Sequence, residues 1–207
     1  HDMSMRLHGS AVNNYTATLL GGATASQTQP GEDLKFDVTL PDWMKDAWKN
    51  RKTDAADEPV DNSAFKPYSL RFRDNRPISV DFTDGKVKVT VHISRLKSGD
   101  ESFANWDVTG TYTPELAGGG IVLKRDGDLE MLPANFKGSL TPRQVAERSN
   151  LEKELNARSA QGRGFPKTVE FESLKPEDAL KDAGPLEFNQ FSSDGGWLTV
   201  AWDRRKK

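Results

Sequence analysis

The chain has 207 residues, of which 35% are hydrophobic and 29% are charged, and it contains no cysteine. Its 29 basic and 31 acidic side chains leave a net charge of −2, which argues against binding nucleic acid by electrostatic attraction. Without cysteine the sequence offers no disulfide, thiolate nucleophile or cysteine-bound metal, and it has no apolar run long enough for a transmembrane helix.

This length predicts a single domain over residues 1–207. The first residues resemble the start of a piece excised from a longer chain, and they lack the pattern of a secretion signal. Residues 49–67 contain two prolines and four acidic residues among few apolar ones, which predicts a flexible loop.

The first third of the chain predicts two short helices and one strand between them. Apolar residues recur at helical spacing over residues 10–20, and Gly21-Gly22 supplies a helix stop. Residues 34–40 alternate apolar and polar side chains, as in a strand with one buried face. After Pro41, the spacing of Trp43 and Trp48 predicts a short helix.

The middle of the chain predicts an antiparallel meander. Residues 68–73, 78–83 and 86–93 alternate apolar and polar side chains, and Asp84-Gly85 joins the last two runs as a hairpin turn. Further alternating or short apolar runs cover 106–113, 121–124 and 129–132. We expect one buried and one solvated sheet face.

A longer helix is predicted at about 141–160, because Thr141, Pro142 and Gln144 form a capping-box start. Its narrow apolar stripe, which includes Leu151 and Leu155, predicts packing against a sheet. Residues 175–178 could open another helical turn, and residues 186–202 predict a final hairpin. The expected fold is therefore α+β, a twisted antiparallel sheet of seven to nine strands with the 141–160 helix on its concave face.

The three histidines give little sign of chemistry. His1, His8 and His92 are not at metal-ligand spacing, and His92 is expected to be a solvated residue on the polar face of its strand. His8 and Ser10 lack the glycine-flanked turn of a catalytic serine.

The acidic and glycine-rich segments are also interpreted as structural. The carboxylates of residues 54–61 lack the spacing of a calcium loop, and Asp126-Gly127-Asp128 is typical of a turn. Gly118-Gly119-Gly120 precedes a strand, so it predicts a hairpin loop rather than a phosphate cradle. We therefore assign no metal site, no cofactor and no catalytic residue.

The basic residues are interspersed with acidic ones. Arg71, Arg73 and Arg76 alternate with aspartates, which favours a mixed-charge surface over an anion site. The last four residues, 204–207, are all basic and are read as a frayed end, with contact to an anionic surface as the alternative. The five tryptophans favour core or rim positions over a sugar-stacking platform.

Three stretches resemble an uncharacterised family of exported bacterial proteins: Leu7–Asn14 with Leu20–Gly22, Asn75–Ile78 with Asp84-Gly85, and Gly195–Leu198. The resemblance implies export to the periplasm or beyond, as one part of a longer chain. It assigns no activity and no functional residue. A long antiparallel sheet with one helix is also similar in outline to the lipid-binding domains of the BPI-like superfamily.

Three functions follow as expectations. The first is a non-enzymatic structural or interaction module of an exported bacterial protein, whose partners are other domains of that protein or a separate protein. The second is a carrier that holds a lipid or acyl chain between helix and sheet. The third is a hydrolase whose carboxylates converge only in the fold. The residues favour the first and leave catalysis open.

Overall fold

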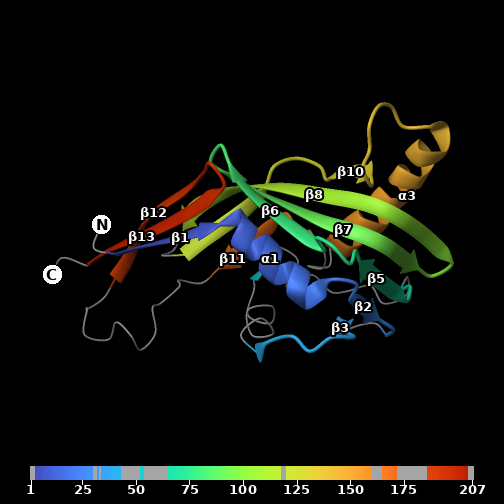
Figure 1. Cartoon of the computed structure of the whole chain (residues 1–207), viewed down its shortest axis with the longest axis horizontal. Coiled ribbons are helices and arrows are strands. Elements are labelled where there is room, and N and C mark those ends of the chain that lie inside the picture. The colour runs from blue at the N-terminus through green and yellow to red at the C-terminus, as the bar shows by residue number, and fades with distance from the viewer. Residues whose placement is uncertain are drawn as a thin grey trace.

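The computed structural model describes residues 3–29, 32, 34–42, 52–53, 65–117, 120–159, 165–171 and 186–204. Most of these residues lie in strands (Figure 1). The elements in chain order are β1 (Met3–His8), α1 (Gly9–Leu20), β2 (Thr24–Gln27), β3 (Lys35–Phe36), β4 (Lys52–Thr53), β5 (Tyr68–Phe72), β6 (Ile78–Thr83), β7 (Lys86–Ser98), β8 (Glu101–Ala117), β9 (Gly120–Arg125), β10 (Glu130–Pro133), α3 (Pro142–Ser159), β11 (Thr168–Phe171), β12 (Leu186–Asp194) and β13 (Trp197–Arg204).

The long hairpin of β7 and β8 forms the centre of a ten-stranded sheet (Figure 1). The strand order is β3-β2-β5-β7-β8-β9-β11-β4, and β6 and β10 add to β7 and β8 beside this path. Every pairing between the described strands is antiparallel. The α+β class, the antiparallel sheet and the main helix are thus confirmed.

One face of this sheet is apolar and carries the core. Ile93 is opposite Trp106, and Val91 is opposite Val108, so these side chains share a face. On that face α3 contributes Leu151 and Leu155, which are 0% and 4% exposed and pack in one cluster with Trp106. The predicted packing of the helix on the sheet is therefore confirmed.

The start of α3 has the predicted capping box. The Gln144 backbone N–H donates to Thr141 Oγ1 at 3.3 Å, and the Thr141 N–H donates to Gln144 Oε1 at 2.9 Å. These two bonds satisfy amide groups that the first turn of a helix leaves without partners.

Helix α1 covers the outer edge of β6. The Val80 N–H donates to Asn13 Oδ1 at 2.6 Å, and Asn13 Nδ2 donates back to the Val80 carbonyl at 3.3 Å. Thr16 Oγ1 also donates to the Ile78 carbonyl at 3.1 Å. The helix begins at Gly9, where a Cβ would lie 2.7 Å from the Val80 carbonyl oxygen. Side chains of α1 therefore complete the hydrogen bonding of a strand edge that would otherwise be open to pairing.

A second, three-stranded sheet joins the two ends of the described chain in the order β1-β13-β12. Figure 1 shows both termini beside it. Its hairpin turn docks on the β6–β7 turn: Gly196 N donates to the Phe82 carbonyl at 2.8 Å, and Gly85 N donates to the Ser193 carbonyl at 2.7 Å. Phe191 and Leu198 pack against the cluster of Phe82, Val87 and Tyr112, which extends the core to this end.

A polar network attaches the last turns of α3 to β5 and β7. Glu154 accepts hydrogen bonds from buried Ser98 and from Lys66 Nζ, the latter at 3.0 Å. The Arg158 guanidinium lies 3.7 Å from the centroid of the Tyr68 ring, and burial raises the pKa of Tyr68 to about 12. The helix is thus fixed by polar as well as apolar contacts.

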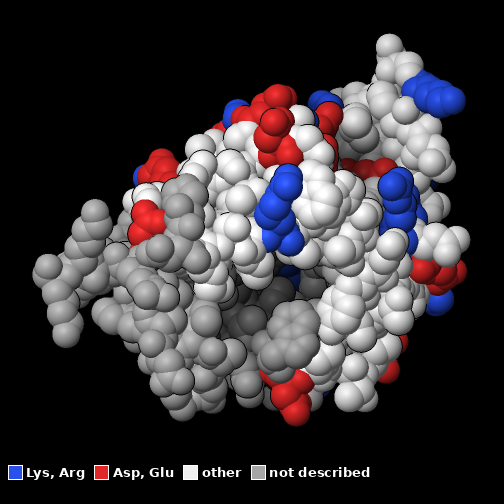
Figure 2. All heavy atoms as spheres, turned by 60° about the vertical axis from the view of Figure 1, so that its left-hand side comes forward, with Lys and Arg blue, Asp and Glu red and all other residues white. Residues whose placement is uncertain are grey.

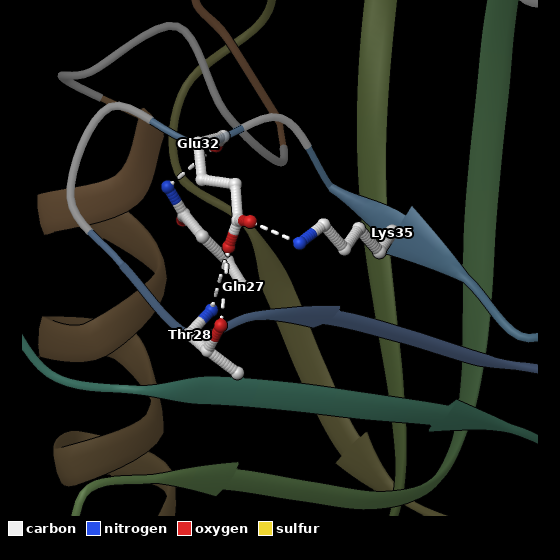
Figure 3. A network of polar contacts seen from close by, with 4 residues as sticks. All are labelled: Gln27, Thr28, Glu32 and Lys35. Atoms are coloured by element: carbon white, nitrogen blue, oxygen red, sulfur yellow. Dashed lines mark hydrogen bonds and ion pairs between the residues drawn. The ribbon is translucent and has the colours of Figure 1, made fainter.

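The loop between β2 and β3 is closed by a smaller network around Glu32 (Figure 3). The Glu32 carboxylate accepts from Thr28 Oγ1 at 3.1 Å and pairs with Lys35, while its carbonyl accepts from Gln27 Nε2 at 2.8 Å. The Lys35 ammonium lowers the pKa of Glu32. This network stabilises the edge of the sheet at β3.

The structure differs from the sequence predictions at strands β3 and β1. The expected strand 34–40 is reduced to β3. At Asp37 the side-chain carboxylate, in place of a backbone carbonyl, accepts the hydrogen bond from the Thr24 N–H at 2.7 Å. Within the predicted loop 49–67, Lys52–Thr53 forms β4 on β11, whereas 49–51 and 54–64 lie outside the described residues. The strand Met3–His8 was not predicted, since its partner β13 lies at the other end of the chain. The helices expected at 43–48 and 175–178 lie outside the described residues.

Replacing Asn13 by alanine should destabilise the fold. The substitution removes both partners of the part-buried Val80 backbone groups, at a cost of about 1–2 kcal/mol in the free energy of unfolding. Urea unfolding followed by circular dichroism measures this loss. Asn14→Ala, an exposed neighbour in the same helix, is the control and should change stability by less than about 0.5 kcal/mol. Equal stability of the two variants would contradict the role of Asn13.

The Glu154 network should make stability depend on pH. Burial raises the pKa of Glu154, but its hydrogen bonds with Ser98 and Lys66 outweigh burial and leave that pKa below its usual value. The stabilisation is therefore complete above the unfolded carboxyl pKa of about 4.3 and is lost as pH falls through the lower folded value.

Unfolding of Glu154→Gln should accordingly depend less on pH between about pH 7 and about pH 3 than unfolding of the unmodified chain. The control is Glu152→Gln on the same helix, which should keep the original pH dependence. Parallel pH profiles for Glu154→Gln and the unmodified chain would rule out this assignment.

Candidate functional site: a polar pocket on the open face of the sheet

Three polar side chains form a hydrogen-bonded chain across β6, β7 and β8. Ser79 Oγ lies 2.8 Å from His92 Nε2, and His92 Nδ1 lies 2.6 Å from Asp107 Oδ1. The strand register produces this chain, because His92 is directly opposite Asp107 and Ser79 is opposite Thr90. All of these side chains lie on the face opposite the apolar core.

Arg73 extends the chain from the end of β5. Its Nη2 lies 2.7 Å from Asp107 Oδ1, so the same carboxylate oxygen contacts both the guanidinium and the imidazole. The side chains of Arg73, His92 and Asp107 are 22%, 14% and 24% exposed. Asp107 is thus a partly buried anion with two partners, and it orients His92.

A pocket of about 480 Å³ lies beside this chain. Its floor is formed by β7 and β8, where Thr90 Oγ1 and Thr109 Oγ1 are hydrogen bonded at 2.8 Å. The turn before β6 forms one wall, and β10 with the loop after it forms the other. The lining residues are Arg73, Asn75, Arg76, Thr90, His92, Asp107, Thr109, Glu130, Leu132, Pro133, Asn135 and Phe136.

Two lining residues have a left-handed backbone. Arg76 has φ 65° and Asn135 has φ 53°. Asparagine adopts this conformation readily, but arginine does so at a cost, and Arg76 also precedes Pro77, which restricts its backbone further. The loop that carries Asn135 is held on the sheet by a hydrogen bond from Ala134 N to the Asn105 carbonyl at 2.7 Å. Strained backbone of this kind is concentrated at binding and catalytic sites.

The Ser79–His92–Asp107 chain has the distances of a catalytic triad but not its surroundings. Ser79 is not among the residues that line the pocket, and it lies within a regular strand. In serine hydrolases with a nucleophile elbow, the residue after the nucleophile donates its N–H to the oxyanion. Here that amide, Val80 N, is already bonded to Asn13 Oδ1. The geometry therefore supports orientation of His92 rather than acyl transfer.

The structure corrects the expectation for His92, which is mostly buried, at 14% exposed, and held between Ser79 and Asp107. His8 Nδ1 lies 2.7 Å from Ser10 Oγ and also accepts from Ser10 N, as the N-cap of α1. Its ring contacts Trp197 edge-on with centroids 4.7 Å apart. This histidine therefore has a structural role, as expected. His1 lies outside the described residues.

The other residues that the sequence singled out give less information about function. Acidic and basic side chains are interspersed on the face shown in Figure 2. Of the arginines expected on a mixed-charge surface, Arg71 lies 3.9 Å from Asp74 and Arg73 lies 2.7 Å from Asp107. Trp106 and Trp202 are buried, Trp197 is 40% exposed, and Trp43 and Trp48 lie outside the described residues. No group of three metal-ligating side chains occurs within the described ranges. Residues 54–61, 118–119 and 205–207 lie outside those ranges.

Several pocket residues were not anticipated as functional. The sequence indicates a turn for Asn75, a mixed-charge surface for Arg76, and a solvated strand face for Asp107 and Thr109. The sequence does contain a sign of this site. The polar face of two strands predicted as neighbours carries histidine, threonine and aspartate rather than only lysine. The register that aligns them was not known from the sequence.

Replacing Arg76 by glycine should relieve the backbone at the pocket rim. Because glycine adopts positive φ without a steric cost, we expect the free energy of unfolding to stay level or to rise by up to about 1 kcal/mol. Arg95→Gly, an exposed position within β7, is the control and should lose about 0.5–1 kcal/mol. Chemical denaturation measures both. Equal losses in the two variants would show that Arg76 is unstrained.

No known protein family, curated protein or solved structure matches this chain. Among the helices described, none is long and apolar enough to cross a membrane.

Proposed function

We propose that this chain is a non-enzymatic binding module that holds a small polar ligand in the pocket on the open face of the sheet. The observation that carries the proposal is the convergence of four chain segments, 73–76, 90–92, 107–109 and 130–136, on one cavity. The volume of about 480 Å³ lies in the range of small-ligand sites. The left-handed Arg76 gives further support, because such strained backbone is concentrated at binding sites.

The described core supports a binding module more than a lipid carrier. A carrier needs space between helix and sheet for an acyl chain. Leu151 and Leu155 of α3 instead pack directly into the cluster of Trp106 and Met131. A site for apolar ligands has no evident place among these contacts, whereas the polar pocket is open on the opposite face.

Export and membership of a larger bacterial protein remain part of this proposal. They rest on the resemblance of three short stretches to exported bacterial proteins. The ligand or the partner would then be met outside the cytoplasm, where the absence of cysteine avoids unwanted disulfide exchange.

A second candidate function is hydrolysis by Ser79. The distances of 2.8 Å and 2.6 Å along Ser79, His92 and Asp107 favour it specifically. Activity would require a substrate that reaches Ser79 Oγ and displaces the Asn13 side chain from Val80 N to free an oxyanion donor.

The expected hydrolase with two converging carboxylates has a weaker basis. Asp107 and Glu130 do line one pocket, but Asp107 is already paired with Arg73 and His92.

Polar fragments should bind at the pocket. In ¹H–¹⁵N correlation spectra titrated with small alcohols, amides, carboxylates and amines, hits should shift the amides of Thr90, Thr109 and Asn135, with dissociation constants of about 1 mM. Thr109→Trp fills the floor and should abolish these shifts. Thr111→Trp is the matched control, since Thr111 lies on the same strand and face but outside the pocket lining.

Other outcomes point to other functions. Hits that persist in Thr109→Trp, or that scatter over the surface, would contradict the binding module. An acyl lipid retained in native mass spectrometry would favour the carrier. A fluorophosphonate adduct on Ser79 that is absent from Ser79→Ala would favour the hydrolase.

A further inference from the structure

If the proposed function holds, the chemistry of the pocket limits the class of ligand that it can bind. We infer that the pocket binds a neutral saccharide. Its formal charges cancel, because Arg73 and Arg76 are balanced by Asp107 and Glu130. Arg73 is moreover neutralised directly by Asp107 at 2.7 Å. A ligand with net charge of either sign therefore gains little from this site.

The groups on the floor and rim suit hydroxyl ligands. The Thr90 and Thr109 hydroxyls and the Asn75 and Asn135 amides can each both donate and accept hydrogen bonds. A sugar hydroxyl also donates and accepts, so each of these groups can bind it either as a hydrogen-bond donor or as an acceptor. Anions need only donors, and cations need only acceptors. Four groups that can both donate and accept hydrogen bonds are therefore the lining that we expect for a polyol.

One wall of the pocket is apolar. Leu132, Pro133 and Phe136 line the side formed by β10 and its following loop, and all three are partly exposed. A sugar ring presents C–H groups on its faces and hydroxyls at its edge. An apolar wall with an aromatic ring beside a floor of hydroxyls matches that division.

A zwitterion such as a free amino acid is the strongest competitor, since its charges also cancel. It would have to use Arg76 and Glu130, the two charged side chains of the pocket that have no ion pair among the described contacts. Both are exposed at the rim, where charge pairs are screened by water. The partly buried floor is formed by hydroxyls, and it therefore favours the polyol.

The test compares matched probes on the whole chain by ¹H–¹⁵N titration. The neutral probes are glucose, galactose, mannose and the disaccharides maltose and cellobiose. The charged probes are glucuronate, glucose 6-phosphate and glucosamine, with glutamate and glycine as zwitterionic competitors. At least one neutral sugar should shift the amides of Thr90, Thr109 and Asn135 and bind at least tenfold more tightly than its charged analogues.

Variants then separate specific binding from a folding defect. Phe136→Ala and Thr109→Val should each weaken the sugar at least tenfold while the remaining spectrum stays folded. Thr111→Val is the matched control and should bind as the unmodified chain does, because Thr111 lies outside the lining. Equal weakening in Thr111→Val would overturn the assignment.

The outcomes distinguish the saccharide inference from the proposed binding function on which it rests. If polar fragments occupy the pocket but only amino acids or charged sugars compete for it, the saccharide inference fails and the binding module stands. If no probe or fragment reaches the pocket, both fail. If a bound disaccharide is cleaved, the ligand class stands and the non-enzymatic assignment fails.

Discussion

The register between β7 and β8 is the constraint on which both the core and the pocket depend. Because side chains alternate along a strand, this single ladder turns Ile93 and Trp106 towards α3 and turns His92 and Asp107 towards the pocket. A slip of β8 by one residue would turn Asp107 towards the core and expose the tryptophan. Core packing therefore fixes the site: a substitution that moves the ladder to relieve the core also moves the groups that face the ligand.

The edge of β6 shows a second dependence between distant segments. Ser79 projects from a strand whose outer hydrogen bonds at Ile78 and Val80 come from the side chains of Thr16 and Asn13, not from another strand. The side-chain amide of Asn13 offers both an N–H donor and a carbonyl acceptor, as a peptide unit does, so Asn13 can substitute for a neighbouring strand. Helix α1 thus keeps this edge from pairing with other chains and holds the wall behind His92 in place.

The local elements were largely predictable, and their distant pairings were not. Alternation and Asp84-Gly85 were enough to predict β6 and β7, and the capping box was enough to predict the start of α3. Strand β1 alternates as clearly at Met3, Met5 and Leu7, but its partner β13 is remote in the sequence, so the alternation does not indicate what it pairs with. The site was missed for the same reason, since only the register places His92 opposite Asp107. Contacts between distant segments cannot be predicted in this way, because periodicity indicates which face of a strand a residue occupies and not which strand lies beside it.

The pairing of β1 with β13 has a consequence for how the protein is made. Leu7 and Leu198 lie in register although about 190 residues separate them, and closing so long a loop is slow. At ribosomal speeds of about 5–20 residues per second, β1 waits roughly 10–40 s for its partner to be synthesised. During that time its apolar side chains and both of its edges are open to other nascent chains. The β1–β13 ladder can therefore form only after almost the whole domain has been synthesised, and until then β1 lacks the partner that pairs with it in the folded domain.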